Sequence, residues 1–184
     1  FLYRVDIRLR PWGNDGPLIS TLPGFLQYLD KSARLWEKQA LLKLRPIAGD
    51  LALGEELREA SFTRIIHLPE SQVKAEVYAM KQRTEEVLRE KGREWGEVKL
   101  GIGSIRDIEF VIQYLQIVNL RNFPQIRTRA TLKAIPFLRT NGLLPAGDAR
   151  ILHDGYIFLR TIEHFLQMME YRQTYTLPSE KTAI

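Results

Sequence analysis

An aspartate and two arginines share one face of the first ten residues, where apolar and charged side chains alternate. The alternation predicts a β-strand over residues 1–10, with Asp6, Arg8 and Arg10 on the same side. A carboxylate that helps to hold a divalent metal, beside arginines that bind phosphate, is the combination that phosphoryl and nucleotidyl transfer require. An exposed sheet face with cross-strand ion pairs produces the same pattern, so both interpretations stay open.

A second candidate site surrounds the glycines of residues 99–110 (KLGIGSIRDIEF). Gly101 and Gly103 allow the backbone to approach another group closely, and the helix predicted to follow offers free N–H groups to an anion. Four polar residues of this otherwise apolar helix fall within about a quarter of its circumference and form a polar stripe. They are Arg106, Glu109, Gln113 and Gln116.

The same segment also has an explanation that needs no ligand. Ser104 at the helix start, with Asp107 three residues later, resembles a capping box, and Arg106 and Glu109 have the spacing of an i,i+3 ion pair. A connector with two glycines is a weak signal by itself. The pattern alone therefore leaves a ligand-binding and a structural interpretation open.

Histidine and cysteine offer no comparable site. His67 is expected to end a helix, and His153 and His164 form no His-x-x-x-His or Glu-x-x-His pair. The chain has no cysteine, which excludes disulfides and cysteine-based zinc sites.

Helices must position most of these residues, because the chain follows helical periodicity almost throughout after Thr21. We expect a mainly α fold, a helical bundle of about five or six helices that follows one strand. The predicted helices cover residues 22–44 with a break near 30–33, 54–67, 71 to about 91, 105–120, 131–140 and 148–171.

Composition limits the classes of partner. With 184 residues, 45% of them hydrophobic, the chain can bury the core of one domain, and it has no apolar run long enough to span a membrane. The net charge of +5 permits phosphate, nucleic acid or an acidic protein surface as a partner. The basic residues are dispersed and no nucleic-acid-binding motif occurs, so we expect neither a nucleic-acid nor a membrane partner.

A single strand cannot form a sheet, because its backbone donors and acceptors need neighbours. The chain also begins with Phe1 rather than Met. We therefore expect it to be a piece of a longer protein that was divided within a sheet. The expected domains are residues 1–21, the end of the sheet-containing domain, and residues 22–184, the helical bundle.

Several short blocks follow one another along nearly the whole chain. They are residues 5–11 (VDIRLRP), 36–43 (WEKQALLK), 45–50 (RPIAGD), 99–101 (KLG), 105–110 (IRDIEF), 159–167 (LRTIEHFLQ) and 176–178 (TLP). In this order they resemble the glutamine synthetase adenylyltransferases, also called glutamate–ammonia-ligase adenylyltransferases. The order of the blocks is far more specific than any single motif.

This resemblance implies an enzyme with two similar halves, each a nucleotidyltransferase domain of the DNA polymerase β type followed by a helical bundle. One half attaches AMP from ATP to a tyrosine of glutamine synthetase, and the other removes AMP by phosphorolysis and yields ADP. Residues 1–21 would then end a truncated nucleotidyltransferase domain. The family's upstream Asp-x-Asp pair is absent from the sequence, so we expect this chain alone to be inactive.

The resemblance also implies the roles of individual residues. Asp6 would be catalytic, as the family's third metal-binding carboxylate for Mg²⁺ or Mn²⁺. The residues expected near the nucleotide (ATP or ADP) and its phosphates are Arg8, Arg10, Lys99, Arg106, Asp107 and Glu109. The implied partners are glutamine synthetase and a PII-type nitrogen-signalling protein, and the implied location is the cytoplasm.

The blocks at 99–101 and 159–178 look more like the N-terminal, adenylyl-removing half of the family. Ser104 stands where the family has a glycine in its Gly-Gly-Ile-Arg motif. The serine side chain restricts how closely a phosphate can approach, which is compatible with a weakened activity. The alternatives are the adenylylating half, a related uridylyltransferase that acts on a PII protein, or a bundle that serves as a docking or regulatory module.

Overall fold

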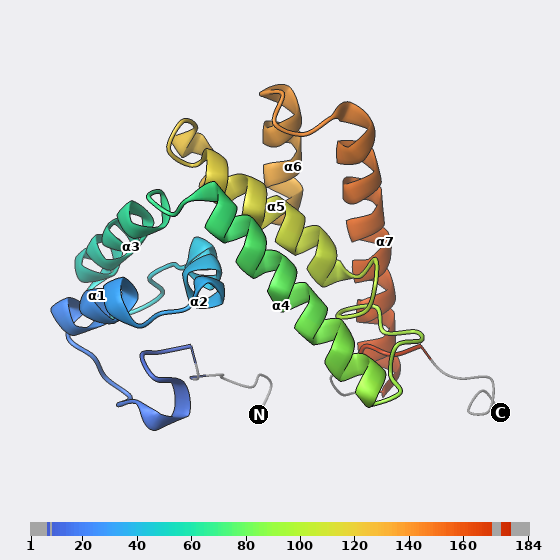
Figure 1. The fold of residues 1–184 in the computed structure, drawn as a ribbon, viewed down its shortest axis with the longest axis horizontal. Helices are drawn as coiled ribbons and strands as arrows, with labels where there is room; N and C mark the ends of the chain where they lie inside the picture. Colours follow the sequence, from blue (N-terminus) through green and yellow to red (C-terminus); the bar gives the residue numbers. More distant parts are fainter. Residues whose placement is uncertain (1–6, 8, 171–173, 178–184) are drawn as a thin grey trace. The chain divides into compact units, whose positions relative to one another are not determined.

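The expected mainly α fold is confirmed by a computed structural model of the chain, which describes Ile7, residues 9–170 and residues 174–177 (Figure 1). Within these residues it contains seven α-helices, and the β-type pairing is an isolated bridge between Glu97 and Thr176. The chain separates into two compact units, Phe1–Leu68 and Pro69–Ile184.

The helices fall into two sets, one in each unit. The first unit holds α1 (Leu22–Lys31), α2 (Leu35–Ala40) and α3 (Leu51–Ile65), and the second holds α4 (Glu70–Glu90), α5 (Ile105–Asn119), α6 (Thr131–Thr140) and α7 (Ala146–Glu170).

Polar side chains set the helix ends of the first unit. The Asp50 carboxylate accepts a hydrogen bond from the backbone N–H of Leu53 and so starts α3 before Gly54, where the sequence predicted its beginning. The predicted break after α1 is confirmed, because the Glu37 carboxylate accepts from the Arg34 N–H at 2.8 Å and begins α2 there. The apolar core of this unit is Leu29, Leu35, Leu41, Leu42, Phe62 and Ile65.

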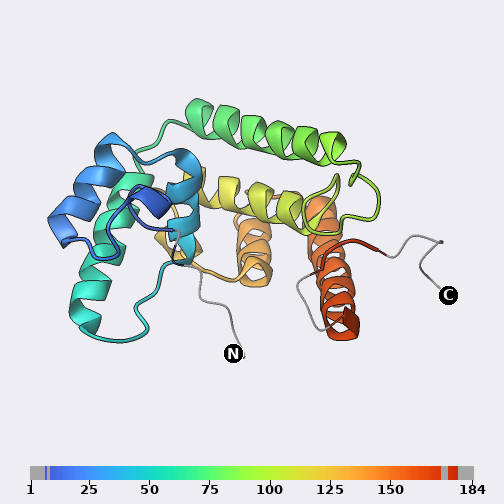
Figure 2. The same cartoon turned by 90° about the horizontal axis from the view of Figure 1, so that it is seen from below.

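In the second unit, α5 packs against α4 and also against α6 and α7. Figures 1 and 2 show α4 and α5 side by side and running in opposite directions. The bounds of α5 and α6 match the predicted 105–120 and 131–140 to within one residue. The core of this unit includes Val73, Ile105, Ile112, Ile126, Ala134, Leu138 and Leu166.

Most of the strand predicted over residues 1–10 lies outside the described residues. Among those described, Leu9 and Arg10 form a bend rather than a strand. The domain boundary expected between Thr21 and Leu22 stays a prediction.

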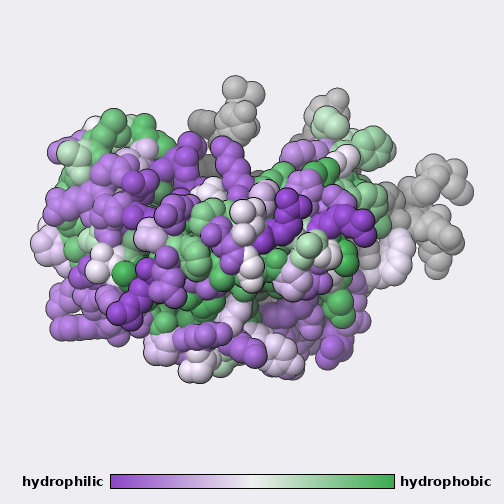
Figure 3. Space-filling view, turned by 90° about the horizontal axis from the view of Figure 1, so that it is seen from above, coloured by the Kyte–Doolittle hydropathy of each residue, from purple (hydrophilic) through white to green (hydrophobic). Residues whose placement is uncertain are grey.

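The surface mixes residue types. On the face that Figure 3 shows, hydrophobic residues are interspersed among hydrophilic ones. No helix within the described residues is long and apolar enough to cross a membrane.

Gln116, on the predicted polar stripe of α5, holds the loop between α5 and α6 by hydrogen bonds. The side chain is buried, and its amide nitrogen donates to the backbone oxygens of Ile126 and Thr128, each at 2.8 Å. Buried carbonyl groups that lose a donor are costly, so this amide stabilises the loop against the core.

We expect Gln116→Met to lower the free energy of unfolding by about 1–3 kcal/mol, because two carbonyl oxygens lose their donor. Gln125→Met is the matched control, since Gln125 is exposed in the same loop, and its effect should stay within about 0.5 kcal/mol. Urea unfolding followed by circular dichroism measures both variants. Equal effects would contradict the role given to the Gln116 amide.

Candidate functional site

Of the three strand residues predicted to act on phosphate and metal, Asp6 and Arg8 lie outside the described residues. Arg10 is described, and its guanidinium donates to the backbone oxygens of Ile7 at 2.5 Å and Gly16 at 3.4 Å. A Cβ on Gly16 would lie 1.9 Å from the Pro11 oxygen, so glycine is required where this loop folds back. In the described residues Arg10 therefore closes its own loop.

The glycines of the connector, residues 97–103, allow the chain to turn back on itself. A Cβ on Gly101 would lie 2.7 Å from the backbone oxygen of Glu97, to which the Gly101 N–H donates. Gly103 has a φ of 70°, which favours glycine. The close approach predicted from these glycines is thus an approach of the connector to itself.

The first turn of α5 does not offer a free anion site, and that prediction is wrong. The backbone N–H groups of Ile105 and Arg106 donate to the oxygens of Val98 and Lys99 at 3.0 and 3.1 Å, and the N–H of Asp107 donates to the Ser104 oxygen. The backbone oxygens of the connector accept hydrogen bonds from the first N–H groups of α5, which are the groups that an anion would use.

The predicted capping box also takes a different form. Ser104 stands at the N-cap of α5, but its hydroxyl makes no capping bond and is buried with no hydrogen-bond partner among the described residues. Asp107 instead accepts from the Gly103 N–H at 2.8 Å, one residue before the cap. Asp107 therefore stabilises the turn before α5 through this hydrogen bond, whereas the Ser104 hydroxyl does not.

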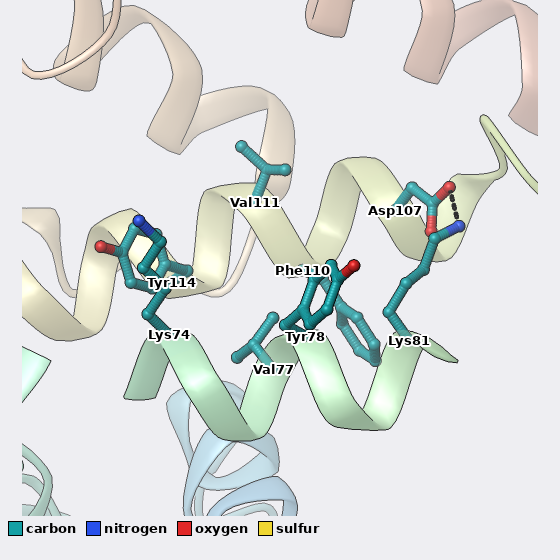
Figure 4. Close-up of a pocket in the computed structure, with 8 residues that line it drawn as sticks. All are labelled: Lys74, Val77, Tyr78, Lys81, Asp107, Phe110, Val111 and Tyr114. Carbon is teal, nitrogen blue, oxygen red and sulfur yellow. Dashed lines mark hydrogen bonds and ion pairs between the residues drawn. The ribbon is translucent and has the colours of Figure 1, made fainter. Parts of the chain in front are cut away.

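Asp107 also joins α5 to α4. Its carboxylate pairs with the Lys81 ammonium (Figure 4). The ammonium also lies 2.7 Å from Glu85 and 3.5 Å from the Gly101 oxygen. Burial lowers the pKa of Lys81, but its hydrogen bonds and charge contacts with Asp107 and Glu85 outweigh burial and raise that pKa. Lys81 is held as a cation that links α4, the connector and α5.

Glu109 and Lys99 belong to a second polar cluster, centred on α7. The Arg160 guanidinium reaches Glu163 at 2.5 Å and Glu109 at 3.0 Å, and the Tyr156 hydroxyl donates to Glu109 at 3.0 Å. Lys99 lies 3.5 Å from Glu163. Burial raises the pKa of Tyr156, which keeps this hydroxyl a hydrogen-bond donor, with the Glu109 charge acting in the same direction.

Sequence reasoning missed the buried carboxylate of Glu97. Its side chain is 0% exposed and lies 3.1 Å from Arg93, and the Thr176 hydroxyl donates to it at 3.4 Å. Backbone bonds from Val98 and Leu177 join the same two segments. The local sequence around Glu97 does not predict this burial, because Thr176, which contacts the carboxylate, lies 79 residues away in the chain.

Arg106 differs from the other predicted nucleotide contacts of this unit. Its guanidinium is half-buried, 5.9 Å from the centre of the Phe110 ring, and within the described part of the chain it forms no ion pair. Burial lowers the pKa of Arg106, opposed by the charges of Glu109, Glu97 and Asp107.

The structure thus does not gather the predicted site residues in one place. Asp107 faces α4, Glu109 and Lys99 face α7, and Arg106 forms no ion pair with a carboxylate among the described residues. No group of three or more His, Asp or Glu side chains among the described residues could hold a metal ion. The nucleotide- and metal-binding roles stay predictions.

Two known family models match the chain in succession. Residues 1–60 match the model described as glutamate-ammonia ligase adenylyltransferase, and residues 72–183 match the one described as GlnD PII-uridylyltransferase. The interval between the two matches contains the boundary of the two compact units, between Leu68 and Pro69.

Individual relatives match over nearly the whole chain. Bifunctional glutamine synthetase adenylyltransferase/adenylyl-removing enzymes of Cutibacterium acnes and Nocardia farcinica are 39% and 41% identical, over 100% and 97% of this chain. The enzyme of the same description from Hahella chejuensis is 36% identical over 98%. The matches cover 18–19% of these relatives, so the chain spans about a fifth of their length.

Replacing Ser104 tests whether its hydroxyl caps α5, as the sequence predicted, or makes no capping bond, as in the structure. A serine that capped the helix would cost about 1 kcal/mol on replacement by alanine. Because the hydroxyl is buried without a partner, we expect Ser104→Ala to leave the melting temperature unchanged or to raise it. Thr21→Ala, which removes a hydroxyl that does accept from Gly24, should lower it, and a comparable loss in Ser104→Ala would contradict the structure.

Removing the cation between α4 and α5 should destabilise the protein. We expect Lys81→Met to cost about 1–2 kcal/mol, since it leaves a partly buried carboxylate without its cation. Lys74→Met, at an exposed position of the same helix, is the control and should change stability little. Unfolding in urea measures both.

The contribution of Lys81 should also depend on pH. The folded pKa is raised, so this stabilisation is fully present below the unfolded lysine pKa of about 10.4. It should be lost as pH rises through the folded value. A difference between the parent chain and Lys81→Met that disappeared already near neutral pH would contradict the ion pair.

Proposed function

The chain belongs to the glutamine synthetase adenylyltransferase family, and on that premise we propose that it forms part of the half that removes AMP from modified glutamine synthetase. In this reaction an oxygen of inorganic phosphate attacks the phosphorus of the AMP group. The bond from that phosphorus to the tyrosine oxygen breaks, the tyrosine regains its proton, and ADP leaves.

The match over nearly the whole chain to enzymes described as both adenylylating and adenylyl-removing carries this proposal. The assignment to the removing half rests on the sequence block 99–101 and the series of blocks within 159–178. Their charged residues Lys99, Arg160 and Glu163 meet in one cluster of the second unit. The two blocks therefore contact each other, and their charged residues together hold the connector against α7.

We assign different tasks to the two ends of the chain. Asp6 would contribute one carboxylate to a Mg²⁺ or Mn²⁺ site, with Arg8 and Arg10 beside the phosphates. The described residues do not form a metal site by themselves, so this assignment depends on Asp6 and on further carboxylates of the family. Bound metal would align the attacking and leaving oxygens.

In the second unit, Arg106 is the residue we propose to contact the nucleotide. Arginine binds phosphate oxygens in a bidentate way, and this guanidinium is not paired with a carboxylate among the described residues. Lys99, Asp107 and Glu109 would act by positioning, because each already holds a partner of opposite charge.

A second candidate function follows from the family model that matches residues 72–183. Its description names a PII-uridylyltransferase, which favours a helical unit shared by enzymes that modify nitrogen-signalling proteins. In that case the second unit would serve for docking or regulation, with a PII-type protein as partner. The adenylylating half of the family, which uses ATP, is the remaining enzymatic alternative.

The test uses a full-length enzyme that contains this segment. We expect Asp6→Asn to lower phosphate-dependent release of AMP from adenylylated glutamine synthetase by about a hundredfold or more, because asparagine keeps the size of the side chain but loses the charge that holds metal. Incorporation of labelled AMP from ATP should continue at the other half. Asp15→Asn, which changes an exposed aspartate of the nearby loop, is the control.

Loss of AMP incorporation with intact AMP release would assign the segment to the adenylylating half instead. Loss of neither activity would remove Asp6 from the metal site.

A further inference from the structure

An apolar groove lies between α4 and α5, away from the α7 cluster. It has a volume of about 420 Å³ and is lined by Val77, Tyr78, Phe110, Val111 and Tyr114, with Lys74, Lys81 and Asp107 at its ends. Figure 4 shows Val77, Tyr78 and Phe110 between the two helices. Sites for small molecules have volumes of about 300–1,000 Å³ and similar apolar walls with few polar groups.

Two polar contacts join α4 to α5 at the ends of this groove. The Lys81–Asp107 ion pair bridges the helices at one end, and at the other the Tyr114 hydroxyl donates to Glu70 at 2.9 Å. The seven steps from Lys74 to Lys81 span about 10 Å of helix. Because the groove is this short, it suits a compact ligand better than a helix lying lengthwise.

The walls leave apolar surface in contact with water. Tyr78 is 64% exposed and Val111 is 42% exposed, although both line the groove. A ligand with an apolar body would cover them, and removal of apolar surface from water favours binding.

Charge at the groove selects the head group of such a ligand. Lys81 is already bound by Asp107 and Glu85, but Lys74 has no ion pair within the part of the chain that the structure describes. Its ammonium is exposed at the end of the groove near Tyr114 (Figure 4). A carboxylate or sulfonate at that end would meet a cation that is in no ion pair among the described residues.

We propose that this groove binds a small monoanion with an aromatic or aliphatic body, the body between α4 and α5 and the anionic group at Lys74. The site is separate from the proposed nucleotide contact at Arg106 and does not depend on the proposed function.

Fluorescence of 1-anilinonaphthalene-8-sulfonate, an aromatic sulfonate, tests the proposal on the whole chain. We expect saturable binding that decanoate displaces and that uncharged decanol displaces less well. Val111→Asp should abolish binding, because it places a charge in the apolar wall. Lys74→Glu should weaken it about five- to tenfold, as expected for one exposed charge contact.

Two controls separate the groove from other surfaces of the same unit. Ile151→Asp changes an exposed apolar residue of α7, and Lys133→Glu makes the same charge change on α6. Both should keep the affinity of the parent chain, and circular dichroism should show that all four variants are folded.

Absence of binding, or equal losses in the Val111 and Ile151 variants, would overturn the proposal. Equal displacement by decanol and decanoate would overturn it as well, because it would remove the role of Lys74. Binding by this chain but not by a full-length relative would also overturn it, since another protein surface would then cover the groove.

Discussion

A carboxylate that is removed from water must be compensated by cations and hydrogen-bond donors, and this constraint organises the second unit. Glu163 is 2% exposed and Glu97 is 5% exposed. Arg160 and Lys99 compensate the first, and Arg93 with the Thr176 hydroxyl compensates the second. Together these contacts draw the connector and residues 174–177 onto the helices, so the placement of the connector follows from the burial of two charges.

The same constraint gives the acidic residues on α5 a structural role. Asp107 and Glu109 are only two positions apart, so they lie on different faces of the helix and pair with α4 and α7 respectively. The helix is thereby fixed from two sides, and its first turn is closed by the connector. Residue types that suit phosphate binding are largely used for internal compensation here, and among the residues that the structure describes Arg106 is the cation near this turn that forms no ion pair.

Much of the architecture could be predicted from local patterns. The break after α1, the start and end of α6 and the long α4 follow from apolar spacing and from residues that begin or end helices, because these signals act within a few positions. The start of α3 was missed by three residues because Asp50 caps it. The candidate site was harder to predict, since the same glycines and polar residues suit both a ligand and a turn.

The sequence by itself determined that the chain is helical, and its ordered blocks indicated the family. Both properties reside in the residues and their order. Only the tertiary structure decided that the connector satisfies the first N–H groups of α5, that Glu97 is buried against residues 174–177, and that Lys99 and Glu109 meet α7. All but the first of these contacts join residues tens of positions apart, and no local pattern specifies which distant charge will compensate a buried one.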